Sequence, residues 1–125
     1  MTDRGLGNAG PYFDQETPVK KIPTDPIELR SLELVWAERL RQKEVEGYTP
    51  AHDDEHTEGQ LAVLAAAYVL SSRGPNYTWL VGQVALVLSV SSEAFHFKPA
   101  DPIRDLVRAG ALILAELERR LRADA

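Results

Sequence analysis

Apolar side chains recur at helical spacing in four segments of this 125-residue chain. Spacings of three and four residues place side chains on one face of an α-helix, whereas the residues on one face of a strand alternate with a period of two. The first segment shows the helical pattern most clearly, in Leu29, Leu32, Trp36 and Leu40. We therefore predict an all-α fold, a compact four-helix arrangement with helices near 26–45, 58–72, 78–90 and 102–122.

Local capping signals mark where three of these helices begin. Asp25-Pro26-Ile27 and Asp101-Pro102-Ile103 each place an N-capping aspartate before a proline at the first helical position. Thr57 followed by Gln60 predicts a capping box at the start of the second helix.

The second and third predicted helices are the most apolar segments. Residues 58–72 are almost entirely small and apolar, so we place this helix at the centre of the bundle, buried on most sides. Residues 77–90 fit a buried helix or, because they are rich in valine, strands; the length of the run favours a helix. Together these two helices present more apolar surface than the others cover, which predicts an oligomer, most simply a homodimer.

The fourth predicted helix carries a long apolar stripe. Gly110 within it predicts a close crossing against a partner helix. The residues expected to face the core are Leu106, Gly110, Ile113, Leu114, Leu117 and Leu121.

Composition narrows the class of protein. Glycines and prolines crowd residues 1–24, which predicts a flexible N-terminal arm followed by a single helical domain over 25–125. The net charge of −5 makes nucleic acid an unexpected partner, and the absence of cysteine removes disulfides and thiolate zinc sites. No apolar run reaches the roughly 18 residues that span a bilayer, so we expect a cytoplasmic protein without a membrane partner.

The charged segment between the first two helices holds the candidate chemistry. Gly47 ends the first helix and Pro50 is expected to prevent a regular restart, so the segment is predicted to be a loop. Within it, His52-Asp53-Asp54-Glu55-His56 offers two imidazoles and three carboxylates in five successive positions. Hard cations prefer several oxygen ligands, and zinc accepts imidazole.

Two interpretations of these acids remain open. Asp53, Asp54 and Glu55, joined by Asp105 from the fourth helix, are the candidate metal ligands. A wider set that includes Glu38 and Glu116 matches the way bundles hold magnesium or manganese with inward carboxylates. Alternatively, His52 and Asp53 cap the second helix or bind loop backbone. The helical acids then form ordinary i, i+4 pairs with arginine, or, for Asp105, stabilise the start of the helix through its dipole.

One stretch of the chain also supports a resemblance. The run Glu46-Gly47-Tyr48-Thr49-Pro50-x-His52-Asp53-Asp54-x-His56, an alanine-rich helix ending in Tyr68, and Lys98-Pro99-x-Asp101 follow one another in the chain. This pattern resembles a family of small, uncharacterised proteins of bacteriophages and prophages, over roughly residues 34–121. The layout is also similar to the all-α MazG-like nucleotide pyrophosphohydrolases, which bind magnesium through a Glu-x-x-Glu pair on the second helix. Here that helix begins Glu58-Gly59-Gln60-Leu61 and has no such pair.

The small size of the chain, the missing catalytic pair and the unusually apolar helix pair favour a non-catalytic phage-type accessory protein that binds a host protein or a nucleotide-like small molecule in the host cytoplasm, for example as an inhibitor of host defence. This hypothesis needs no cofactor, and magnesium is expected only under the alternative. The alternative is a divergent magnesium-dependent nucleoside triphosphate pyrophosphohydrolase. The residues expected to bind the ligand are Arg39, Tyr48, His52, Asp53, Asp54, His56, Arg104 and Arg108.

Overall fold

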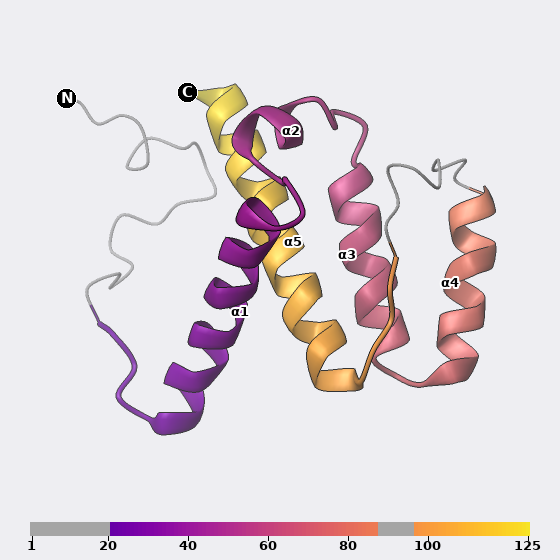
Figure 1. Ribbon diagram of the computed structural model, residues 1–125, viewed down its shortest axis with the longest axis horizontal. Helices are drawn as coiled ribbons and strands as arrows, with labels where there is room; N and C mark the ends of the chain where they lie inside the picture. The colour runs from indigo at the N-terminus through magenta and orange to yellow at the C-terminus, as the bar shows by residue number, and fades with distance from the viewer. Residues whose placement is uncertain (1–20, 88–96) are drawn as a thin grey trace.

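The computed structural model describes residues 21–87 and 97–125, which form five helices and, over those two ranges, no strand (Figure 1). The helices are α1 (Pro26–Glu44), α2 (Pro50–Asp54), α3 (Gln60–Ser71), α4 (Pro75–Val87) and α5 (Pro102–Asp124). The all-α class is confirmed, and the valine-rich segment is helical up to Val87. The last predicted residues of that helix, 88–90, and most of the predicted arm, 1–20, lie outside the described residues.

Helix α5 is the central element. It packs against α1, α3 and α2, while α4 packs on the far side of α3 (Figure 1). Helices α1 and α5 run side by side in the same direction, and a Cβ atom added to Gly110 would lie only 3.1 Å from a methyl carbon of Val35. The predicted close crossing at Gly110 is therefore confirmed.

The apolar core lies between α3 and α5. Helix α3 contributes Leu61, Leu64, Ala65 and Tyr68, and its smaller residues Ala62 and Ala66 are exposed, so it is less enclosed than expected. From α5 the core takes Ala109, Leu112 and Ala115, and the small side chains of the two alanines allow the helices to approach closely.

The expected core stripe of α1 has the right period but faces the wrong way. The stripe of α5 does so only in part, because Gly110, Leu114 and Leu121 are partly buried. On α1, Leu32 and Trp36 are about half exposed, whereas the polar Glu38, Arg39 and Gln42 are buried. On α5, Leu106, Ile113 and Leu117 are likewise exposed. The polar side chains of α1 can occupy the interior because hydrogen-bonding and ionic partners meet them there.

The charged segment is not a loop throughout. Thr49 caps a short helix by accepting a hydrogen bond from the backbone N–H of His52 at 3.3 Å, and Pro50 occupies the first helical position. Proline therefore begins a helix here instead of preventing one.

Of the capping predictions, two are confirmed and one is wrong. Asp25 accepts hydrogen bonds from two backbone N–H groups, and Asp101 accepts one from Arg104. Helix α3, however, begins after Gly59, whose φ of 81° is left-handed and which supplies no side-chain cap. The side-chain oxygen of Gln60 accepts a hydrogen bond from the backbone N–H of Glu58 and not from that of Thr57, so the predicted capping box does not form. No helix among the described residues has the length and apolarity needed to cross a membrane.

Candidate functional site

A fully buried ion pair joins three helices at one end of the domain. The side chains of Arg39 on α1 and Asp53 on α2 are both 0% exposed, and Arg39 Nη2 lies 3.1 Å from Asp53 Oδ2. The same nitrogen donates to Glu118 of α5 at 2.8 Å, and Nη1 donates to the carbonyl oxygen of Tyr48 at 3.3 Å. Arg39 thus holds α1, α2, α5 and the turn before α2 together.

Two imidazoles extend this cluster along α2. The ring of His52 stacks on Tyr48 with centroids 4.8 Å apart and planes 4° from parallel, and its Nδ1 lies 3.0 Å from Asp53. His56 Nδ1 lies 2.8 Å from the carbonyl oxygen of His52, which places the proton on that nitrogen. Burial away from water, reinforced by the charge of Glu46, raises the pKa of Tyr48 to about 12. His52, which Asp53 contacts at Nδ1, therefore stacks on a buried phenol that is neutral at ordinary pH.

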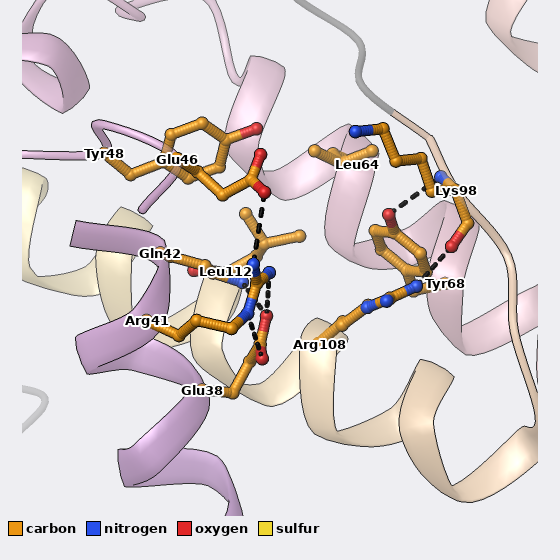
Figure 2. A pocket seen from close by; sticks show the side chains of 10 residues that line it. All are labelled: Glu38, Arg41, Gln42, Glu46, Tyr48, Leu64, Tyr68, Lys98, Arg108 and Leu112. Atoms are coloured by element: carbon orange, nitrogen blue, oxygen red, sulfur yellow. Dashed lines mark hydrogen bonds and ion pairs between the residues drawn. The ribbon is translucent and has the colours of Figure 1, made fainter. Parts of the chain in front are cut away.

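Tyr48 forms part of the wall of a cavity of about 240 Å³ between α1, α3, α5 and the segment that leads into α5 (Figure 2). The floor is apolar, and the two phenol rings and several charged groups surround it. The lining residues are Glu38, Arg41, Gln42, Glu46, Tyr48, Leu64, Tyr68, Lys98, Arg108 and Leu112.

On the α1 wall of the cavity, the carboxylates are paired with arginines. Arg41 donates to both carboxylate oxygens of Glu38, at 2.9 and 2.8 Å, and to Glu46 at 3.1 Å. Arg104 lies 3.3 Å from the same Glu38 carboxylate. Burial alone raises the pKa of Glu38, but hydrogen bonding to Arg41 and the charges of Arg41 and Arg104 outweigh it and hold that pKa below its ordinary value. Glu38 is therefore an ionised acceptor. Beside it, the buried side-chain oxygen of Gln42 has no hydrogen-bond partner among the described residues.

The opposite wall is cationic. Lys98 donates its backbone N–H to the Tyr68 hydroxyl at 2.9 Å, and Figure 2 shows its amino group extended toward the cavity. The guanidinium of Arg108 lies 5.7 Å from the centroid of the Tyr68 ring and donates to the carbonyl oxygen of Lys98. Neither cation forms an ion pair within the part of the chain that the structure describes. This wall therefore presents two positive charges beside an aromatic ring.

The ligand-binding residues expected from the sequence divide into three groups. Tyr48 and Arg108 line the cavity, and Arg104 reaches its wall through Glu38. Arg39 and His52 contact Tyr48 directly, through its carbonyl oxygen and its ring, and Asp53 and His56 contact His52. Asp54 points elsewhere, to a surface ion pair with Arg122 at 2.8 Å.

Several lining residues were missed from the sequence. Arg41 and Gln42 follow Glu38 at i+3 and i+4, which places all three on one helical face, but only Glu38 was considered, as a metal ligand. Tyr68 and Lys98 are 30 residues apart and meet only in the folded chain.

The predicted metal ligands do not form one site. Asp54 pairs with Arg122 near the end of α5, whereas the fully buried Asp105 accepts a hydrogen bond from the N–H of Ala100 at the start of the same helix. Asp105 and Arg122 are 17 positions apart, which corresponds to about 25 Å along a helix. Across residues 21–87 and 97–125, no three His, Asp or Glu side chains are arranged to hold a metal ion.

The wider acidic set is also dispersed. Glu116 is bound by Arg119 at 2.8 Å and by Arg120 at 2.9 Å, as expected for pairing at i, i+3 and i, i+4. The i, i+4 pairing with arginine is therefore confirmed for Glu116, through Arg120. Glu38 is bound instead by Arg41 at i, i+3 and by Arg104 of another helix.

Comparison of the chain with protein-family models, with curated proteins and with solved structures finds no match in any of the three. The resemblance to phage proteins and to MazG-like enzymes remains a hypothesis from the sequence.

Proposed function

We propose that the protein is a non-catalytic phage-type accessory protein of the host cytoplasm that binds an anionic, nucleotide-like small molecule in the cavity between α1, α3 and α5. The observation that carries this proposal is the pair of cations, Lys98 and Arg108, beside the Tyr68 ring and opposite a wall of hydrogen-bond acceptors. The phage context comes from the resemblance of the sequence.

The two walls suit the two ends of a mononucleotide. Lysine and arginine are the usual partners of phosphate groups, and arginine contributes two parallel donors. On the other wall, the carboxylate of Glu46, with a side chain that is 29% exposed, accepts hydrogen bonds, as the amino groups of a nucleobase require. Tyrosine rings supply flat apolar surfaces for a base to contact.

The size of the cavity sets the size of the ligand. Pockets for drug-sized molecules usually enclose about 300–1,000 Å³, and this cavity encloses about 240 Å³. A nucleoside monophosphate therefore fits the proposal better than a dinucleotide or a folded segment of a host protein.

Isothermal titration calorimetry tests the proposal directly. The protein is titrated with nucleoside monophosphates carrying each base, with the corresponding nucleosides and with inorganic phosphate. We expect at least one monophosphate to bind, and Arg108→Gln to weaken that binding at least tenfold. Arg120→Gln is the matched control, because Arg120 lies on the same helix but is exposed and pairs with Glu116.

Two results would overturn this proposal. One is the absence of binding by every monophosphate at millimolar concentration. The other is equal affinity in the wild type and the Arg108 variant.

The alternative, magnesium-dependent hydrolysis of nucleoside triphosphates, requires carboxylates that are free to hold the metal. Glu38 and Glu46, the two acids that line the cavity, are both bound by Arg41. Incubation with magnesium and mixed triphosphates, followed by detection of monophosphate and pyrophosphate, distinguishes the two functions. Release of both products at a rate abolished by Glu38→Gln would establish the enzyme instead.

A further inference from the structure

A second surface is defined by the apolar side chains that α1 and α5 leave exposed. Each helix contributes four large apolar residues that are between 36% and 69% exposed. We call this set the α1–α5 face. Its members are Leu29, Leu32, Trp36 and Leu40 on α1, and Ile103, Leu106, Ile113 and Leu117 on α5.

The two halves of the α1–α5 face point the same way, opposite to the cavity. Successive residues of a helix are about 100° apart, so Trp36 lies about 160° around α1 from the cavity residue Glu38. Leu106 lies at the same angle around α5 from the cavity residue Arg108. Helices α1 and α5 run side by side in one direction (Figure 1). The helical angles therefore place both stripes on the side of the helix pair away from the cavity. The tight contact of Val35 with Gly110 joins them into one surface.

We propose that a second copy of this chain covers the α1–α5 face, which makes the protein a homodimer with its two cavities on outer surfaces. This placement differs from the sequence-based expectation, which assigned the surplus apolar surface to the second and third predicted helices.

The area of the face matches what a dimer needs. Eight large side chains at about half exposure offer on the order of 500 Å² of apolar surface. A standard interface takes about 800 Å² from each partner, of which roughly 56–65% is apolar, so about 450–520 Å². The α1–α5 face therefore supplies the apolar share of a standard interface without rearrangement.

The charges on this face favour an identical partner in antiparallel orientation. Glu33, with a side chain that is 69% exposed and lies 3.9 Å from Arg30 Nη1, is toward the start of α1. Lys43, whose amino group lies 5.8 Å from the centroid of the Trp36 ring, is near its end. A two-fold axis perpendicular to the helices brings Glu33 of each copy over Lys43 of the other.

Sedimentation equilibrium of the full chain tests the proposal over a range from about 1 to 100 µM. We expect a dimer, and we expect Ile113→Glu to raise its dissociation constant at least 100-fold, because the new carboxylate is buried without a partner. Trp79→Glu is the matched control, because Trp79 is as exposed as these residues but lies on α4. Far-UV circular dichroism verifies that both variants remain helical. The conservative variant Ile113→Leu should have the same dissociation constant as the wild type.

A monomeric wild type at 100 µM overturns the proposal. So does a dimer that dissociates on Trp79→Glu and not on Ile113→Glu. The orientation has its own test: Glu33→Lys should weaken the dimer, and adding Lys43→Glu should restore it. Failure of this restoration overturns the antiparallel arrangement. Nucleotide binding by the Ile113→Glu variant should be unchanged, because the cavity lies on the other side of the helix pair.

Discussion

Neutralising Asp53 should destabilise the domain far more than neutralising its neighbour Asp54. Asp53 and Arg39 are fully buried and 3.1 Å apart. Removing one charge from such a pair leaves the other uncompensated in the interior, which typically costs about 3–5 kcal/mol. Glu118 still lies 2.8 Å from the same guanidinium nitrogen and has a side chain that is 32% exposed, so part of the compensation survives. We therefore expect Asp53→Asn to cost about 3 kcal/mol, near the lower limit.

Asp54→Asn is the natural control. The Asp54 carboxylate is 49% exposed and its ion pair with Arg122 is at the surface, where such pairs contribute about 0–1 kcal/mol. Urea unfolding followed by circular dichroism at 25 °C measures both free energies. In thermal melts, the expected loss of stability corresponds to a melting temperature lowered by roughly 10–15 °C for Asp53→Asn. For Asp54→Asn it corresponds to a decrease of only a few degrees. Equal losses in the two variants would refute the reasoning.

A double substitution separates the cost of an unpaired charge from the value of the pair. Arg39→Met combined with Asp53→Leu replaces the ion pair by apolar groups. Such replacements are often neutral or stabilising, whereas single removals are not. The double variant should therefore be more stable than Asp53→Asn. If the double variant is less stable than Asp53→Asn, the ion pair itself stabilises the domain, and the cost of Asp53→Asn is not only that of an unpaired buried charge.

Three further perturbations test other parts of the fold. Folding lowers the pKa of Glu38, so its contribution to the free energy of unfolding is present above pH 4.5 and is lost as the pH falls through the folded-state pKa. Glu38→Gln should therefore reduce the loss of stability at acid pH, measured by urea unfolding at several pH values between 3 and 6. The Tyr48 phenol, with a pKa raised to about 12, should ionise only in strongly alkaline solution, as a late step in absorbance at 295 nm that Tyr48→Phe removes. Gly110→Val should destabilise the domain by about 1–3 kcal/mol through overpacking against Val35, and Val35→Ala should recover part of the loss in the same thermal melt.

The helices themselves could be predicted because their signals are local. Asp25 and Asp101 form their caps within three residues, and glycine and proline breaks separate the apolar runs. The start of α2 carried the same kind of signal, since Thr49 precedes Pro50 as Asp25 precedes Pro26. It was missed because Pro50 was interpreted as a break and not as a first helical residue.

The inward face of α1 could not be predicted in the same way. Arg39 is buried because Asp53 and Glu118 meet it there, and these residues are 14 and 79 positions away. Periodicity identifies a stripe of leucines but gives no information on whether the domain or another molecule covers it. The cavity depends on the same kind of distant pairing, such as that of Tyr68 with Lys98.

The central position of α5 determines when the chain can fold. Helices α1, α2 and α3 all pack on α5, although it follows them in the chain. During synthesis at about 5–20 residues per second, an N-terminal portion without α5 lacks the surface that α3 requires for its leucines. Arg39 likewise lacks Glu118 at that stage. The nascent chain should therefore expose apolar and charged groups together until α5 leaves the ribosome, and its final assembly should be a late, cooperative step that a chaperone can protect.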